Sequence, residues 1–384
     1  MRKSFWKILL IPVVALVTAL AAAPPSYAAS WTIVPTPNAT TEDWLTGITA
    51  FSPSGLWSVG TQYKRPGLTG SGGLIEQYNG TSWQVISSPT PAGCVYCSLT
   101  GVSGSSASDV WAVGEAWFNK VDYDALIEQY NGSSWSLVSD TQPSNGYLYD
   151  VTALSPTDAW AVGVLYNSDN AISGPLLEKY NGSAWTATTT SLAPGGSLTA
   201  VTAVSASDIW AVGNDQGAGL VMNYNGTSWT QVTVPAPTGT TWDLTGVSAT
   251  SASSVWAVGY TEVTGTTSDT EQPIAEYFNG TSWTLTYLPQ PAGYDFNGMS
   301  TVLAVSPTSV WASGWISTYN SSVSNPLFEY FNGSSWSIGP APSLSGYDLG
   351  YSGLASTGGV LWAAGTEFNF PDGILNQTST AEYP

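Results

Sequence analysis

The residues that could carry chemistry in this 384-residue sequence are carboxylates, hydroxyls, amides and aromatic rings. Histidine is absent, which excludes Ser-His-Asp catalysis, histidine-ligated zinc and the usual proton shuttle near neutral pH. A glycoside hydrolase would instead need two carboxyl groups about 5 to 9.5 Å apart. The candidates for such catalytic carboxyls lie beside or near aromatic residues: Asp243, Glu115, Asp122 and Asp124.

Aromatic residues outside the repeats described below point to a second kind of chemistry, the binding of a ligand. Flat rings stack on the C–H faces of sugars, and a few well-placed polar groups fix the orientation of a ligand. Any one of these rings could equally pack against a neighbouring structural unit. The ligand-binding residues that we expect are Trp44, Trp117, Trp242, Trp315, Tyr123, Tyr149 and Asp150.

An internal repeat predicts the strands and loops that position these residues. A segment of the type Val-Trp-Ala-Val-Gly recurs with its tryptophan at positions 57, 111, 160, 210, 256, 311 and 362. A second segment, Glu-x-Tyr/Phe-Asn-Gly-Thr/Ser-Ser-Trp, lies between them with its tryptophan at positions 83, 135, 185, 229, 283 and 336. Units of about 50 residues rich in strand and turn signals predict four-stranded blades arranged radially.

Each unit predicts four strands, which we call a to d. In the second unit they cover 98–104, 109–114, 125–130 and 134–138, with a tight Asn131-Gly132 turn before the last strand. The loops from d to a and from b to c then share one face of the ring, and the candidate residues fall in or beside these loops. We expect that face to bind the ligand, because rigid elements commonly hold variable binding loops.

The two ends of the chain divide one repeat between them. The sequence stops after Glu382–Pro384, which is in the register of Glu76–Tyr78, and residues 29–36 match the segment that should follow. A closed ring explains this division, because 29–36 then completes the last blade. We therefore predict an all-β fold: a single domain, 29–384, that forms a seven-bladed β-propeller of four-stranded antiparallel blades closed by the N-terminal strand.

The order of residues in the repeat resembles that of kelch and galactose-oxidase propellers, here of a secreted bacterial type. Trp111-Ala-Val-Gly114 followed by Tyr130-Asn-Gly-Ser-Ser-Trp135 reproduces that order. The repeat has one glycine where kelch repeats have two, and a longer gap between tyrosine and tryptophan. Its Gly-Thr-Ser-Trp ending is similar to Asp-box repeats, with Tyr78 in place of the aspartate. The copper chemistry of galactose oxidase is excluded, because its histidine ligands cannot be supplied.

The first 28 residues have the features of a secretory signal peptide. An apolar run over 8–23 follows three basic residues, Arg2, Lys3 and Lys7. Ser26-Tyr27-Ala28 then gives a small-x-small cleavage pattern. The alternative is an uncleaved anchor, although the run is shorter than the ~20 residues that a spanning helix needs. We expect a secreted, extracellular protein with no membrane span after cleavage.

The mature chain would be strongly acidic. It keeps all 26 acidic residues and four basic ones, a net charge of −22. Such a chain cannot neutralise many phosphates, which excludes nucleic acid as a partner. Cys94 and Cys97 alone cannot form a metal site, although they permit a disulfide. We expect no cofactor, and we expect a monomer. The acidic surface would suit at most a weakly bound divalent cation.

Three functions are compatible with these features. The first is a binding module that recognises a carbohydrate, another cell-surface ligand or a protein through the loop face. The second is a carboxylate-dependent glycoside hydrolase, and the third is a structural or protein-interaction propeller without a small ligand. We favour the first, because it needs only the loop face, whereas a hydrolase also needs a carboxylate pair at the correct spacing.

Overall fold

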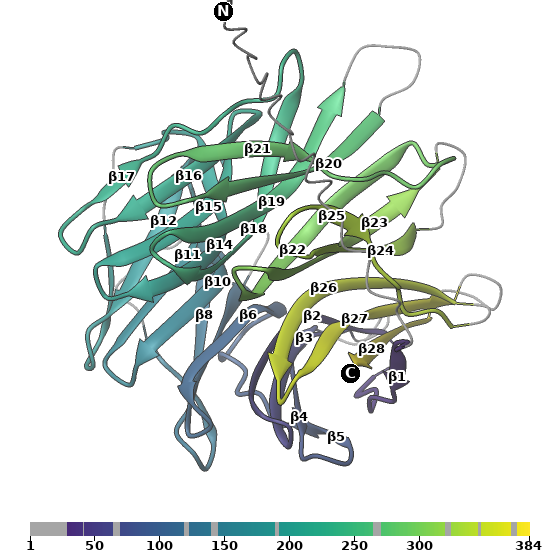
Figure 1. Cartoon of the computed structure of the whole chain (residues 1–384). Helices are drawn as coiled ribbons and strands as arrows, with labels where there is room; N and C mark the ends of the chain where they lie inside the picture. The colour runs from purple at the N-terminus through teal and green to yellow at the C-terminus, as the bar shows by residue number, and fades with distance from the viewer. Residues whose placement is uncertain are drawn as a thin grey trace, which may run out of the picture.

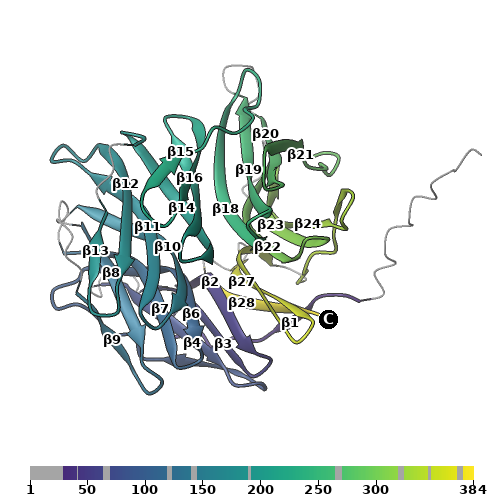
Figure 2. The same ribbon diagram turned by 60° about the vertical axis from the view of Figure 1, so that its left-hand side comes forward.

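The computed structural model is a ring of seven four-stranded antiparallel sheets, the blades of a β-propeller (Figures 1 and 2). It describes residues 29–40, 42–63, 70–118, 123–139, 145–188, 192–263, 270–318, 324–344, 347–369 and 375–384. Strand a of each blade lines the central channel, and strand d lies at the rim. This architecture confirms the predicted all-β, seven-bladed fold. Within the described residues there is no helix that could cross a membrane.

Six blades are each built from four consecutive strands. Blades 1 to 3 consist of β2 (Glu42–Ser52), β3 (Gly55–Tyr63), β4 (Gly72–Tyr78), β5 (Trp83–Ile86), β6 (Tyr96–Ser106), β7 (Asp109–Trp117), β8 (Tyr123–Tyr130), β9 (Trp135–Leu137), β10 (Gly146–Ser155), β11 (Asp158–Tyr166), β12 (Ile172–Tyr180) and β13 (Trp185–Ala187). Blades 4 to 6 consist of β14 (Gly196–Ser205), β15 (Asp208–Asp215), β16 (Ala218–Tyr224), β17 (Trp229–Gln231), β18 (Thr241–Ser251), β19 (Ser254–Val263), β20 (Thr270–Phe278), β21 (Trp283–Tyr287), β22 (Phe296–Ser306), β23 (Ser309–Ser317), β24 (Ser324–Phe331) and β25 (Trp336–Ile338).

The seventh blade joins the two ends of the chain. It contains β26 (Asp348–Thr357), β27 (Val360–Asn369), β28 (Leu375–Tyr383) and, as its outer strand, β1 (Thr32–Val34). β1, at the purple end of the colour scale, lies beside the yellow β28 in Figure 1, and Thr32 pairs with Glu382. The Trp31 ring lies 4.7 Å from Phe328 of blade 6 and donates from Nε1 to the Pro340 carbonyl at 2.7 Å. The predicted closure by the N-terminal strand is confirmed.

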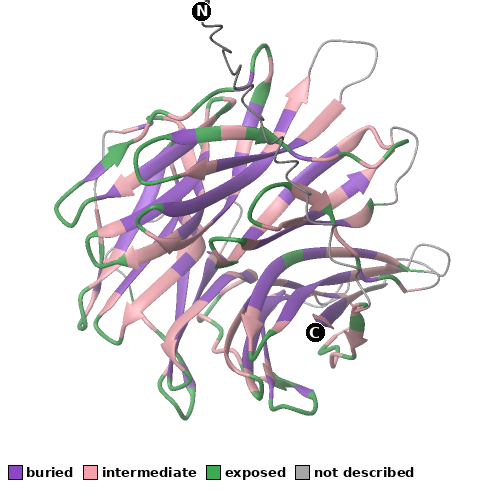
Figure 3. Ribbon diagram, viewed as in Figure 1, coloured by how far each residue is buried: buried purple, intermediate pink, exposed green. Residues whose placement is uncertain are grey.

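Strand b of each blade is a continuous apolar run because it is covered on both faces by neighbouring blades. In β7 every residue from Asp109 to Gly114 is buried. Trp111 of this strand meets Trp185 of the next blade edge-on at 5.1 Å. The same kind of contact recurs around the ring, and Figure 3 shows the buried residues concentrated in the inner strands of each blade.

The hairpins between strands c and d differ from the predicted two-residue turn. Tyr78 pairs with Trp83, which leaves a four-residue loop in which Gly80 alone has a positive φ of 96°. The Asn79 side-chain oxygen accepts from the backbone N–H groups of Thr81 and Ser82 at 3.0 and 3.1 Å. Asparagine therefore stabilises the turn by capping amides rather than by adopting a left-handed conformation.

Strand a of every blade carries a β-bulge at the same position, near the mouth of the channel. The bulged residues are Thr46, Thr100, Tyr149, Thr199, Thr245, Ser300 and Ser352. Thr46 Oγ1 lies 2.9 Å from the Leu99 carbonyl oxygen of the next blade, and Thr100 Oγ1 lies 2.9 Å from that of Leu148. Bulges redirect side chains, and here they produce hydrogen bonds between adjacent blades.

Candidate functional site

A cavity of about 390 Å³ lies at the mouth of the channel, on the face that carries the d–a and b–c loops. We call it the mouth cavity. Its aromatic walls come from four successive blades, 6, 7, 1 and 2: Trp315, Tyr351, Phe368, Trp44 and Tyr96. Hydroxyl groups lie between the rings: Thr46, Thr61, Ser98, Ser300, Ser352 and Thr366. None of the described lining residues is charged.

Trp44 and Trp315 reach the mouth cavity from different strand ends. Trp44 lies at the start of β2 and contacts Tyr63 edge-on, with 5.4 Å between ring centroids. Trp315 lies near the end of β23, where its ring fills the space that a side chain on Gly298 would need. Both indoles are only partly buried, so part of each remains accessible to a ligand. The sequence-based expectation that they share one face is consistent with this placement.

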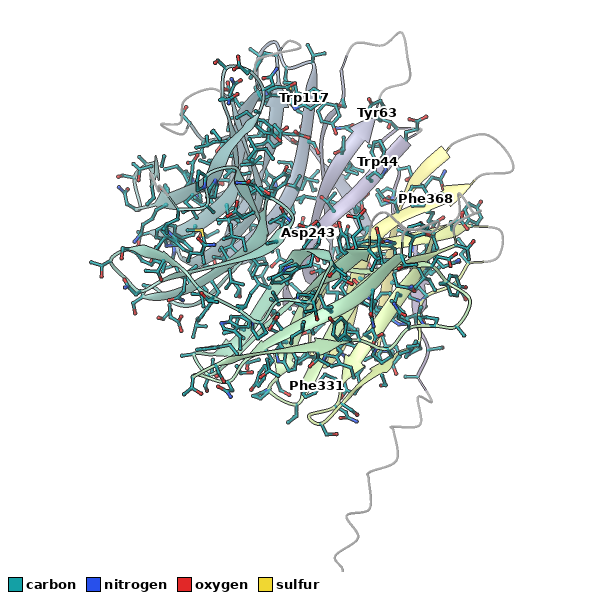
Figure 4. All side chains as sticks on the ribbon, turned by 90° about the horizontal axis from the view of Figure 1, so that it is seen from above. Trp44, Tyr63, Trp117, Asp243, Phe331 and Phe368 are labelled. Atoms are coloured by element: carbon teal, nitrogen blue, oxygen red, sulfur yellow. A yellow bond between two sulfur atoms is a disulfide. The ribbon has the colours of Figure 1, made fainter. Side chains whose placement is uncertain are left out.

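Six further aromatics continue from Trp44 across blades 1 to 3. The ring-to-ring distances along Trp44, Tyr63, Tyr96, Trp117, Tyr123 and Tyr147 lie between 4.9 and 6.1 Å, and Tyr147 also contacts Tyr149. We call these residues the aromatic arc. Figure 4 shows Trp117, Tyr63, Trp44 and Phe368 following one another along the loop face. Trp117 and Tyr123 therefore join the mouth cavity through Tyr96.

Glu115 is hydrogen-bonded to one residue of the aromatic arc, Trp117. Its Oε2 accepts from Trp117 Nε1 at 3.0 Å, and burial raises the pKa of this carboxyl. Asp124 lies on the other face of the same blade, because Glu115 pairs with Ala125 and Ala116 pairs with Asp124. Asp124 lines a separate cavity beside Pro91. Glu115 and Asp124 thus do not form a carboxylate pair, and Asp122 lies outside the described residues.

Asp243 and Trp242 lie in blade 5, away from the aromatic arc. The Asp243 carboxylate accepts from the Tyr260 hydroxyl at 3.3 Å, and burial raises its pKa. Figure 4 shows Asp243 apart from Trp44 and Trp117. Trp242 is buried within the core between blades 4 and 5, where its ring covers Gly219. It contributes to packing, and we leave it out of the proposed binding surface.

Tyr149 and Asp150 line the central channel, a polar cavity of about 250 Å³. Asp150 accepts from the N–H of Val151 at 2.8 Å and from that of Val201, in the next blade, at 2.9 Å. Burial raises the pKa of Asp150 to about 7, and the two backbone hydrogen bonds oppose this effect. Since Tyr149 occupies the position where other blades have a bridging hydroxyl, Asp150 replaces the lost connection between blades 3 and 4.

The cysteines form a Cys94–Cys97 disulfide that links the loop before β6 to the second residue of this strand. Tyr96 lies inside this short loop, and the neighbouring Val95 N–H donates to the Trp117 carbonyl at 2.7 Å. No group of three or more potential metal ligands occurs among the residues that the structure describes. The loop therefore contributes to the site through the position of Tyr96.

Three aromatic residues of the mouth cavity, Tyr96, Tyr351 and Phe368, were not among the expected binding residues. Tyr96 and Phe368 were two of many loop aromatics, and Tyr351 lies inside strand a of blade 7, where most blades have leucine at the aligned position. That substitution was a detectable signal, because Leu45, Leu99, Leu148, Leu198 and Leu244 occupy the same register.

Comparison with known proteins adds evidence on the fold alone. No protein-family model and no curated protein matches the chain. Among solved structures, YCF48 bound to D1 peptide aligns with a TM-score of 0.56 at 13% identity, over 92% of this chain and 96% of that one. YCF48 from Cyanidioschyzon merolae aligns with a TM-score of 0.56 at 16% identity, over 92% and 98%. The GH74 xyloglucanase from Xanthomonas campestris aligns with a TM-score of 0.52 at 15% identity, over 88% of this chain and 53% of that one. At these identities the chain is similar to these proteins as a seven-bladed β-propeller.

Proposed function

We propose that the protein is a secreted recognition module that binds a neutral carbohydrate in the mouth cavity. The observation that carries this proposal is the lining of that cavity, in which aromatic rings alternate with hydroxyl groups and no described residue is charged. Partly exposed rings such as Trp44 and Trp315 can stack on the C–H faces of a pyranose. Hydroxyls such as Ser300 and Ser352 can exchange hydrogen bonds with the hydroxyls of a sugar.

The arrangement of carboxylates favours binding over hydrolysis. A glycosidase needs two carboxyl groups at the sugar bond, one of them as the acid. The described lining of the mouth cavity contains neither aspartate nor glutamate. Glu115 is engaged with Trp117 in blade 2, and Asp243 with Tyr260 in blade 5. The cavity therefore offers stacking and hydrogen bonding without a general acid.

The two kinds of structural neighbour suggest different ligands, a peptide for YCF48 and, by its name, xyloglucan for the GH74 enzyme. Fold likeness does not choose between them. The uncharged, hydroxyl-rich lining favours the sugar. Secretion, a monomeric state and the kelch-type relationship belong to the same proposal, and they rest on the N-terminal sequence and the repeat rather than on the cavity.

A binding panel tests this proposal. Residues 29–384 would be titrated with neutral glucan, xylan, mannan and chitin oligosaccharides while released reducing sugar is measured in parallel. We expect binding without release, and a loss of at least about tenfold in affinity, or about 1.4 kcal/mol, for Trp44→Ala and for Trp315→Ala. Tyr347→Ala is the matched control, because Tyr347 is an exposed loop aromatic outside the described lining of the cavity.

Two results would contradict the proposal. Release of reducing sugar that depends on Glu115 or Asp243 would make the protein a hydrolase. Binding of peptides but of no oligosaccharide, with the same dependence on Trp44, would retain the site and change the class of ligand.

A further inference from the structure

A groove runs down the outside of the ring between blades 5 and 6. It consists of a lower cavity of about 560 Å³ and an upper cavity of about 330 Å³, which share Gln272 and Tyr287. The upper cavity opens among the d–a and b–c loops beside Tyr294 and Asp295, and the lower one extends to Trp336 at the start of β25. None of the ligand-binding residues expected from the sequence lines this groove.

The outer strand of blade 5 departs from most of the other blades beside this groove. In four blades the third residue after the strand-d tryptophan packs into the core shared with the next blade; these residues are Val34, Ile86, Val138 and Val232. Blade 5 has Thr286 at this position, and its side chain is exposed. The next residue, Tyr287, is 47% exposed, where blade 1 has Ser87. A polar residue thus stands at the apolar position, while Leu288, two residues later, is buried in the interface with blade 6.

The tryptophan on the opposite wall is also unusually accessible. The strand-d tryptophans of blades 1 to 5 are buried, whereas Trp336 is only partly buried. Together with Tyr277 and Tyr287 it lines the lower cavity with aromatic surface. Tyr277 stands where blades 1 and 2 have Gln77 and Gln129. Tyr277 and Tyr287 of blade 5 therefore face the partly exposed Trp336 of blade 6 in one cavity.

Apolar side chains, among them Leu288 and Phe331, form part of the remaining lining, and hydroxyls and amides lie beside them. In the lower cavity the polar residues are Thr284, Thr286, Ser334, Ser335 and Gln272, and the upper cavity adds Thr240, Thr261, Thr270 and Gln290. Aromatic walls with many donors and acceptors that carry both functions match the hydroxyl groups and C–H faces of a sugar chain. A fully apolar partner would leave these polar groups without hydrogen bonds.

Charge restricts the ligand further. Glu271 and Asp295 line the upper cavity, and no described lining residue of either cavity is basic. A polyanionic chain would be repelled there. The Trp315 side chain, which lines the mouth cavity, also hydrogen-bonds to Glu271. One contact between side chains therefore connects the mouth cavity with the upper end of the groove.

We propose that the groove between blades 5 and 6 is a second binding site, which holds the continuation of a neutral oligosaccharide whose first units occupy the mouth cavity. The ligand class rests on the proposed function, whereas the location rests on the groove itself. A chain that passes from Trp315 over Glu271 to Tyr287 gains contacts that a disaccharide in the mouth cavity does not make. Long neutral chains should therefore bind more tightly than short ones.

The decisive variant restores the residue that the repeat predicts. Thr286→Ile should fill the lower cavity with the residue that blade 1 has at this position, and it should not lower the stability of the fold. Thr188→Ile, at the same repeat position between blades 3 and 4, is the matched control. Trp336→Ala is a second variant, which removes the opposite wall. Calorimetric titration would use hexasaccharides and disaccharides of the neutral series that bind in the panel, with hexagalacturonate as the anionic probe.

We expect Thr286→Ile and Trp336→Ala each to weaken the binding of the neutral hexasaccharide about tenfold. Disaccharide affinity should stay within about twofold of that of the unmodified protein, and Thr188→Ile should change neither. Hexasaccharide binding that depends on Trp44 but ignores both groove variants would overturn this inference and leave the proposed function intact. Dependence on Thr286 without dependence on Trp44 would overturn the proposed mouth site and the continuous path, and would leave the groove as a separate binding site. Preferential binding of hexagalacturonate, or no binding of any neutral oligosaccharide, would overturn both.

Discussion

The interfaces between blades and the loop face use tryptophan and glutamate in opposite ways. In the interfaces Trp111 and Trp160 are buried against aromatic rings of the next blade, and Glu276 and Glu329 are fully buried. Neither of these carboxyl groups has a hydrogen-bond partner among the described residues. On the loop face, Trp117 is partly exposed and its N–H donates to Glu115. Tryptophan and glutamate are therefore buried packing residues in the interfaces and partly exposed residues on the loop face.

The difference lies in whether the position belongs to the repeat. A repeated residue meets the same neighbours in every blade, so it is selected by packing between sheets. A residue that breaks the repeat faces a channel, a loop or a groove, where the neighbouring blade does not cover it. Glu76, Glu128, Glu276 and Glu329 show the consequence for charge: burial raises the pKa of each to about 8.

The largest effect is expected from opening the ring. A chain that lacks residues 29–36 loses β1, the Trp31 contacts with Phe328 and Tyr383, and the hydrogen bond between Thr36 Oγ1 and the Thr378 carbonyl. Burial of one tryptophan and several hydrogen bonds together suggest a loss of about 5 kcal/mol in the free energy of unfolding. Chemical denaturation followed by tryptophan fluorescence measures it.

A chain that begins at Trp31 is the matched control for the truncation, because it keeps β1 and the Trp31 ring. It should unfold at the same denaturant concentration as the 29–384 protein. If the longer truncation also left the midpoint unchanged, closure by the N-terminal strand would not stabilise the ring, and the interfaces alone would have to hold the seven blades together.

The second effect concerns the buried glutamates of the interfaces. Their folded-state pKa of about 8 lies above the ordinary glutamate pKa of 4.5, so between these two pH values the folded protein binds more protons than the unfolded chain. The contribution of these groups to the free energy of unfolding is fully present below about pH 4.5 and is lost as the pH rises toward about 8. The melting temperature should therefore fall steadily between pH 5 and pH 8.

Glu276→Gln tests this at one interface. The amide has nearly the same shape and cannot ionise, so the variant should be more stable than the unmodified protein by about 1–3 kcal/mol at pH 8 and nearly equal to it at pH 4.5. Glu382→Gln is the control, because Glu382 also lies in a third strand, where it pairs with Trp362 next to the equivalent position, but it is only partly buried. A Glu276→Gln variant with the same pH profile as the unmodified protein would show that this carboxyl stays ionised when buried.

Much of the fold could be predicted because the repeat carries redundant information. The order of the two motifs that contain Trp111 and Trp135 recurs around the ring, and the division of one repeat between Trp31 and Glu382 indicated a closed ring. The turn at Asn79 was less accessible, because an Asn-Gly pair fits two kinds of hairpin and the pairing of Tyr78 with Trp83 decides between them.

The site was predicted only in part, because exposure depends on neighbours in the next blade. Trp44 and Trp315 were expected on one face and line one cavity. Trp242 has the same sequence signal, yet it is buried because Gly219 leaves room for its ring. Tyr287 gave no signal by itself. Only the alignment of strand d between blades shows that Thr286 is polar where most blades have an apolar residue, and that Tyr287 is larger than Ser87 of blade 1.

The third effect concerns Asp150, at the channel position where blade 3 departs from the repeat. Asp150→Ala leaves the N–H groups of Val151 and Val201 without their acceptor, which should cost about 1–3 kcal/mol. Blade 4 tolerates alanine here, since Thr199-Ala200 stands in the same register and Thr199 bridges to the Leu244 carbonyl.

The double variant Tyr149→Thr/Asp150→Ala gives blade 3 the pair found in blade 4, and the new hydroxyl lies in register with the Leu198 carbonyl. It should recover at least about half of the stability lost in Asp150→Ala, because one hydrogen bond between blades 3 and 4 is re-formed. Equilibrium denaturation of the single and double variants measures the recovery. If Tyr149→Thr gave no recovery in the Asp150→Ala background, the carboxylate would not be a substitute for the hydroxyl bridge, and its place in the channel would have to be explained by a ligand.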